Sequence, residues 1–163
     1  VVQLQPLLFE TIDFHNEYFT KLVEVKERSK ASLQKYNRVR SIVAEFNKKY
    51  YGSQDYQVDK IGTAYLYNLE NFMKFEVEYK DNKGIKNNSI VKYFKNLKTI
   101  CNHAIRFELI QKNPVNRYSG KIKTVEAVFL TSDELDSITS HTFKIERLEK
   151  VKDIFLFLIL NIF

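Results

Sequence analysis

The 163-residue sequence contains one cysteine, two prolines, four glycines and no tryptophan. The single thiol, Cys101, excludes an internal disulfide framework and a cysteine-based metal cluster. The scarcity of glycine and proline leaves little material for hairpins, barrels or a glycine-rich phosphate-binding loop. The three histidines, His15, His103 and His141, are far apart and lack the spacing of metal ligands. We therefore expect neither a metal site nor a cofactor.

Long apolar runs are also scarce. The clearest is Ile154 to Leu160, seven residues long, whereas a membrane-spanning helix needs about 20. No basic run followed by an apolar stretch marks a secretory signal near the N-terminus, so we expect no membrane partner. The run is typical of the first buried helix of a structure that continues. Without its partner such a helix favours self-association through its apolar face.

Hydrophobic residues make up 44% of the chain and include 13 Phe and 10 Tyr, which is enough for a real core. Apolar residues recur every three or four positions in four segments, which predicts helices over about 11–28, 31–51, 63–80 and 88–110. Thr11 is the expected N-cap of the first helix, and Gly52 ends the second. A turn over 81–84 follows the third helix, and Pro114 follows the fourth.

Two shorter helices are expected nearer the C-terminus. Thr131 and Glu134 stand three residues apart, the spacing of a capping box before an apolar run. A last helix is predicted over about 146–160. We therefore predict an all-α fold: a four-to-five-helix bundle over 1–114, a short linker over 115–129 and a helical fragment over 130–163.

The net charge of +6 is unevenly distributed along the chain. Residues 26–50 hold eight basic and two acidic residues, and residues 86–123 hold nine basic and one acidic residue. The first and third helical segments are net acidic. The second and fourth helices therefore carry nearly all of the positive charge, which favours an anionic partner.

Helical periodicity places polar side chains opposite the apolar stripe on both basic helices. Cations can neutralise phosphates, while amides and hydroxyls can hydrogen-bond to base edges. The predicted DNA-binding residues are Lys30, Gln34, Asn37, Arg38, Ser41 and Lys48 on the second helix, and Lys92, Lys95, Thr99, Asn102, His103 and Arg106 on the fourth. Any solvated helix face is also polar and lysine-rich. A helical protein-interaction domain with incidental basic faces therefore stays open as an alternative.

Two further segments add a family resemblance. Residues 107–115 read Phe-Glu-Leu-Ile-Gln-Lys-Asn-Pro-Val, and residues 129–135 read Phe-Leu-Thr-Ser-Asp-Glu-Leu. Together with the four preceding helices, they resemble the tyrosine recombinase (phage integrase) family over about Phe9 to Leu160. The similarity is closest to integrases of conjugative transposons.

The resemblance implies a SAM-like core-binding domain over 1–114 and the first helices of a catalytic domain over 130–163. It implies that the second and fourth helices face the major groove of the core recombination site, so that double-stranded DNA is the partner. The corresponding setting is a mobile element and a cytoplasmic, nucleoid-associated protein in a bacterium.

The catalytic residues of that family have no counterpart here. The family uses an Arg in a Thr-Gly-x-Arg turn, a hairpin Lys, a His-x-x-Arg pair, a second His or Trp and a nucleophilic Tyr. The first Arg should follow the helix that ends at Leu160, where the sequence instead reads Asn161-Ile162-Phe163. We therefore expect no catalytic residue and no enzymatic activity in this chain, whereas a full-length parent would be a DNA strand-exchange recombinase.

Overall fold

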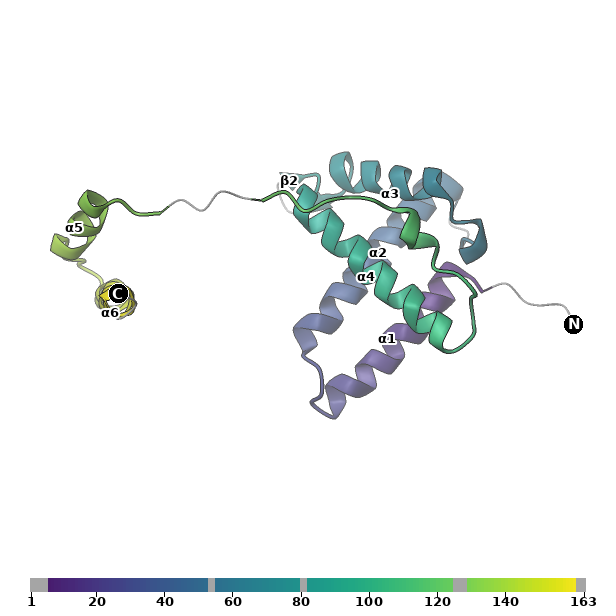
Figure 1. The fold of residues 1–163 in the computed structure, drawn as a ribbon, viewed down its shortest axis with the longest axis horizontal. Coiled ribbons are helices and arrows are strands. Elements are labelled where there is room, and N and C mark those ends of the chain that lie inside the picture. Colours follow the sequence, from purple (N-terminus) through teal and green to yellow (C-terminus); the bar gives the residue numbers. More distant parts are fainter. Residues whose placement is uncertain (1–5, 53–54, 80–81, 125–128, 161–163) are drawn as a thin grey trace, which may run out of the picture. The chain divides into compact units, whose positions relative to one another are not determined.

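The computed structural model describes residues 6–52, 55–79, 82–124 and 129–160 (Figure 1). The chain divides into two units, Val1–Lys123 and Thr124–Phe163. The first unit contains α1 (Leu8–Glu24), α2 (Lys30–Tyr51), η1 (Val58–Lys60), α3 (Thr63–Phe75), β1 (Glu78–Tyr79), β2 (Asn82–Lys83), α4 (Asn87–Arg106) and η2 (Pro114–Arg117), and the second contains α5 (Ser132–Ser140) and α6 (Glu146–Leu160). The predicted all-α bundle is confirmed, with one short hairpin added.

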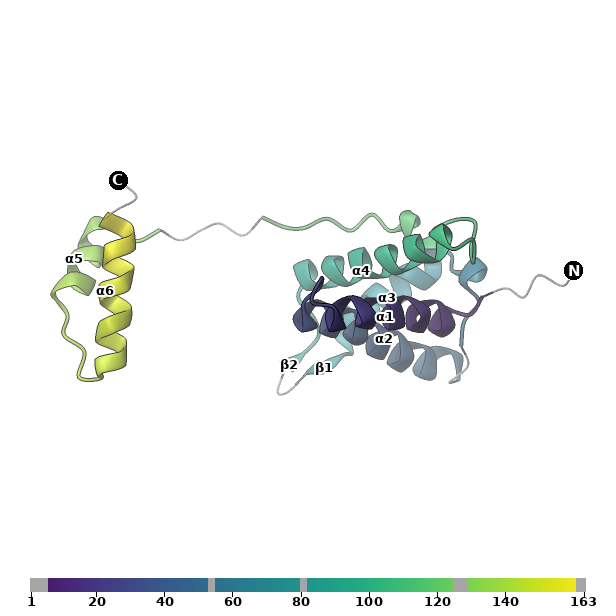
Figure 2. The same cartoon turned by 90° about the horizontal axis from the view of Figure 1, so that it is seen from below.

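The core of the first unit lies among α1, α2 and α4, each of which packs against the other two, while α3 packs against α2 and α4. Seen from below, α1 lies between α4 and the C-terminal half of α2, and α3 lies behind them (Figure 2). The side chains of Ile12, Phe46, Leu66 and Ile100, one from each helix, are fully buried. Burying such side chains contributes roughly 1.5–3 kcal/mol each. The apolar stripes of the four helices therefore meet in one core.

The N-terminus of α1 is capped by a residue from a distant segment. The helix begins at Leu8 rather than at Thr11, whose buried hydroxyl donates to the Leu7 carbonyl at 2.8 Å. Both carboxylate oxygens of Asp55 accept from the Phe9 amide at 3.0 Å. Asp55 thereby satisfies one of the backbone donors that a helix N-terminus leaves free.

Two helices end earlier than their periodicity predicts, each two positions before a residue with positive φ. Lys26 has φ 61° after α1, and Glu108 has φ 57° after α4. The amide of Leu109 donates to the Ala104 carbonyl at 3.0 Å, and α1 has the equivalent bond. This 6→1 pattern closes a helix and satisfies carbonyls of its last turn. It ends α4 at Arg106 instead of Ile110.

The third helix was expected to reach Lys80 but ends at Phe75. The antiparallel β1–β2 hairpin follows it, with Glu78 opposite Lys83. Residues 80 and 81, which include the start of the expected turn, lie outside the described residues. Gly84 closes the hairpin at φ 84°, and its amide donates to the Val77 carbonyl at 2.8 Å.

Residues 115–123, which were predicted from the sequence to lie in the linker, belong to the first unit. Val115 is buried in the core, and the Tyr118 ring stacks on Phe94 with ring centroids 3.7 Å apart. Asn113 Nδ2, just before this segment, donates to the Lys98 carbonyl at 2.9 Å and so joins the chain here to α4. Residues 125–128 of the expected linker lie outside the described residues.

The second unit begins with the predicted capping box, which is confirmed. The Glu134 amide donates to the Thr131 hydroxyl, and the Glu134 carboxylate accepts from the Thr131 amide at 2.8 Å. α6 has the predicted bounds, but several of its apolar side chains are exposed, Ile154 by 61% and Phe157 by 66%. Among the helices of the described residues, none has the length and hydropathy that a membrane span requires.

Candidate nucleic-acid interface

The solvent-facing side of α4 carries a row of cations. Lys92, Lys95, Thr99 and Arg106, which we call the α4 outer face, are all exposed. The opposite side of the helix buries Ile90, Phe94, Leu97 and Cys101 in the core. Because the apolar stripe is committed to packing, these polar side chains point to solvent.

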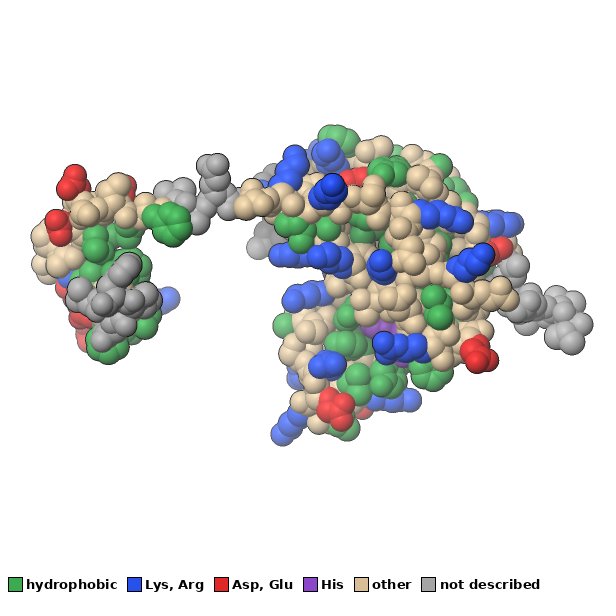
Figure 3. Space-filling model, viewed as in Figure 1, with side chains coloured by type: hydrophobic (Ala, Val, Ile, Leu, Met, Phe, Trp, Pro, Cys, Tyr) green, Lys and Arg blue, Asp and Glu red, His purple; other side chains and the backbone are tan. Residues whose placement is uncertain are grey.

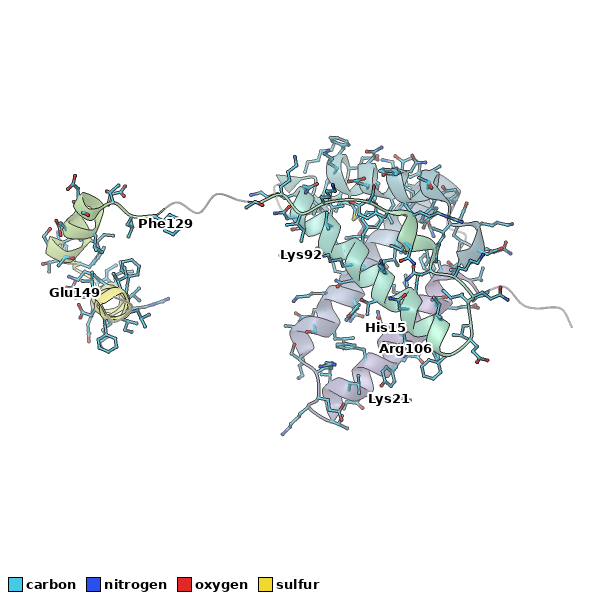
Figure 4. All side chains as sticks on the ribbon, viewed as in Figure 1. His15, Lys21, Lys92, Arg106, Phe129 and Glu149 are labelled. Carbon is cyan, nitrogen blue, oxygen red and sulfur yellow. The ribbon has the colours of Figure 1, made fainter. Side chains whose placement is uncertain are left out.

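The cations of the α4 outer face are also unpaired with carboxylates within the described residues. Among the described residues, no acidic side chain forms an ion pair with Lys92, Lys95 or Arg106. Lys92 lies near the start of α4 and Arg106 at its end (Figure 4). The distance along the helix axis from Lys92 to Arg106 is about 21 Å at 1.5 Å per residue. Lys and Arg side chains gather over this face of the bundle, with few acidic side chains among them (Figure 3). Such a row can follow a line of phosphates.

The N-terminal half of α2 adjoins the middle of α4. The Tyr36 side chain of α2 reaches Thr99 of α4, and burial raises the pKa of Tyr36. Lys30 and Gln34 are exposed on this half of α2. The C-terminal half of α2, which carries Lys48, lies on the other side of α1 from α4 (Figure 2). The structure therefore brings Tyr36 of α2 to Thr99 of the α4 outer face, and Lys48 lies on the other half of α2.

Other predicted residues are partly engaged within the protein. The Asn37 side chain accepts from Asn16 of α1 at 3.1 Å, and the Ser41 hydroxyl donates to the Asn37 carbonyl. Arg38 is half-buried, and its guanidinium lies 3.8 Å from the Glu45 carboxylate. The exposed Asn102 accepts from Asn113 at 2.7 Å. These side chains are oriented by their neighbours, whereas the four predicted lysines are exposed.

The expectation that His103 lies on the exposed face of α4 is wrong. Its side chain is only 8% exposed, because α1 covers this flank of the helix. The rings of Phe14, His15 and Tyr18 lie with centroids 4.9–5.3 Å from that of His103. A wheel drawn for one helix cannot show which flank a neighbouring helix covers.

His103 and His15 form a buried pair at the junction of α1, α2 and α4. Their rings are perpendicular, and the His15 ring also contacts Tyr36 of α2. His15 Nδ1 is hydrogen-bonded to the Asn16 carboxamide oxygen at 2.9 Å, while neither ring nitrogen of His103 has a hydrogen-bond partner among the described residues. Burial lowers the pKa of both, and the nearby His15 and Arg106 lower that of His103 further. No group of three or more His, Cys, Asp or Glu within the described residues could hold a metal ion.

We expect the bundle to lose stability in mild acid. Both histidines have a pKa below the ordinary 6.5 in the folded state, so the unfolded chain binds more protons as the pH falls. The stabilisation is complete above pH about 6.5 and is lost as the pH falls through the lowered pKa values. Thermal melting at pH about 7.5 and about 5 should show a lower midpoint in acid, and His103→Phe should reduce the difference.

The control for this experiment is His141→Gln, which removes an exposed histidine of the second unit. It should leave the pH dependence of melting unchanged. If His103→Phe shows the same dependence as the parent chain, carboxylates rather than the buried pair govern acid sensitivity.

Sequence reasoning missed two further cations beside α4. Lys121 and Lys123 are exposed, and the first turn of α4 holds their backbone. Asn87 Nδ2 donates to the Lys121 carbonyl at 2.9 Å, and Asn88 bonds both the amide and the carbonyl of Lys123 at 2.8 Å. The excess of lysine over 86–123 was visible in the sequence, but its return to α4 was not.

A family model described as phage integrase SAM-like domain matches residues 12–123. The match begins within α1 and covers α2, α3, α4 and the segment up to the end of the first unit. No curated protein and no solved structure matches the chain.

Proposed function

The chain belongs to the phage integrase SAM-like domain family, and from this premise we propose that it is the DNA-binding module of a site-specific tyrosine recombinase of a mobile element. Its partner is then double-stranded DNA at a core recombination site. We further propose that this DNA is bacterial, which would place the protein in the cytoplasm at the nucleoid.

The α4 outer face is the observation that supports this function most strongly. Its cations have no acidic partners among the described residues, and they stand on a helix whose other side is anchored in the core. An α-helix fits the major groove, where lysines meet phosphates and polar side chains reach base edges. The first turns of α2, with Lys30 and Gln34, would extend the contact to a neighbouring phosphate row.

We propose that this chain binds DNA without cleaving it. The match covers the SAM-like domain alone, and we assign residues 130–163 to the start of a catalytic domain. Phosphoryl transfer needs cationic groups clustered around the scissile phosphate, and no residue here stands in the sequence context of the family's catalytic set. Strand cutting and rejoining would then belong to a full-length parent.

The test is a fluorescence-anisotropy titration of the chain against a labelled duplex of about three helical turns. We expect the logarithm of the binding constant to fall linearly with the logarithm of salt concentration, with a slope of about 0.9 per phosphate contacted. Binding that does not respond to salt, or no binding, would contradict the proposal. Self-association through the exposed side of α6, without affinity for DNA, would instead support a protein-interaction domain.

A further inference from the structure

The segment of residues 118–123, here called the return segment, runs back along α4 toward the start of that helix (Figures 1 and 2). Its first residues are fixed by packing: Tyr118 stacks on Phe94. The Ser119 hydroxyl lies 3.1 Å from that of Tyr67 on α3. The segment is therefore anchored on α3 and α4 before it reaches the two asparagines.

Asn87 and Asn88 hold the far end of the return segment. The Asn88 carboxamide donates to the Lys123 carbonyl and accepts from the Lys123 amide, both at 2.8 Å, which reproduces the paired bonding of a β-bridge. Asn87 adds a bond to the Lys121 carbonyl. These three hydrogen bonds hold the backbone of Lys121 and Lys123 against the first turn of α4.

Lys121 and Lys123 extend the row of cations on α4. Lys92, the first cation of the α4 outer face, follows Asn88 by one helical turn on the same side of the helix. The hydrogen bonds from Asn87 and Asn88, here called the clamp, therefore place Lys121 and Lys123 next to Lys92. Lys86, directly before α4, is exposed in the same region. Glu108 is the one acidic residue of the sequence between 82 and 123, and it follows the opposite end of α4.

We propose that the return segment is a second DNA-contacting element, and that Asn87 and Asn88 are its positioning residues. They hold Lys121 and Lys123 in line with Lys92 and Lys95, so that a duplex meets one continuous cationic strip extending past the start of α4. This inference rests on the proposed function and adds to it a contact outside helices α2 and α4.

Two double variants test it in the complete chain, with the same labelled duplex. Lys121→Gln with Lys123→Gln should make the salt dependence of binding less steep by about two, because two phosphates are no longer neutralised by the protein. Asn87→Ala with Asn88→Ala keeps every charge, so the slope should change by less than one while affinity falls threefold or more. In this second variant the amide of Lys123 should also lose its protection from hydrogen exchange, which reports the clamp without DNA.

The matched control is Lys60→Gln with Lys74→Gln, which removes two exposed cations from η1 and α3. If the parent chain does not bind the duplex, the proposed function and this inference fall together. If the parent binds but Lys121→Gln with Lys123→Gln has the slope of the control, the inference alone is overturned. Unchanged affinity in the asparagine variant, despite the loss of protection at Lys123, overturns the positioning role.

Discussion

Replacing Lys92, Lys95 and Arg106 together with glutamine is expected to weaken binding to duplex DNA by about a hundredfold at low salt. Each removed cation that contacts a phosphate also makes the salt dependence less steep by about one, so the slope of the triple variant should fall by about three. Glutamine has nearly the helix propensity of lysine and arginine, and all three sites are exposed, so α4 should keep its fold. Anisotropy titrations over a range of salt concentrations measure both quantities.

The control removes three exposed lysines elsewhere, Lys60, Lys74 and Lys150, and so changes the net charge by the same amount. It should weaken binding by a few-fold, because long-range attraction depends on total charge. Circular dichroism and melting of both variants should match the parent chain. Equal losses of affinity in the two triple variants would show that net charge, rather than the α4 outer face, carries the binding.

The helices were predictable because each has a strong local signal. Apolar residues at helical spacing placed α2 and α6 to within a residue or two of their observed ends, and the Thr131–Glu134 capping box marked the start of α5. The side chains of these stripes are buried in the core, among them Phe46, Leu69 and Phe94. Amphipathic periodicity is a property of a single segment, so it can be read without knowing the neighbours of that segment.

The exact helix ends were less predictable, because they depend on partners far away in sequence. Asp55 caps α1 across 46 positions of chain, and the periodicity within α1 gives no sign of it. Lys26 and Glu108 take positive φ values that ordinarily favour glycine, so the usual end signal was absent there.

Only part of the candidate interface could be predicted from the sequence, because the rest depends on contacts between elements. The wheel separates the polar side of α4 from its apolar side, and it correctly placed Lys92, Lys95 and Arg106 in solvent. Two features required the tertiary structure: the covering of His103 by α1, and the return of Lys121 and Lys123 to the start of α4. Both arise from contacts between elements, which no single-segment pattern records.

Gly84→Ala is expected to destabilise the first unit by about 3 kcal/mol, which lowers its melting temperature by roughly 10 °C. A Cβ on Gly84 would lie 2.2 Å from the Lys74 carbonyl oxygen, and the backbone has φ 84°, which residues with a side chain rarely adopt. The next amide, that of Ile85, donates to the Met73 carbonyl at 2.8 Å. Relieving the clash therefore requires the junction of α3, the hairpin and α4 to move.

The matched variant is Gly62→Ala, where φ is −100° and no atom lies within 4 Å of the added Cβ. It should change the free energy of unfolding by less than about 1 kcal/mol. Because Gly84 stands three residues before Asn87, its replacement should also expose the Lys123 amide to hydrogen exchange at temperatures well below melting. If the two variants have the same melting temperature, the hairpin adapts to a side chain at residue 84, and the start of α4 does not depend on the glycine.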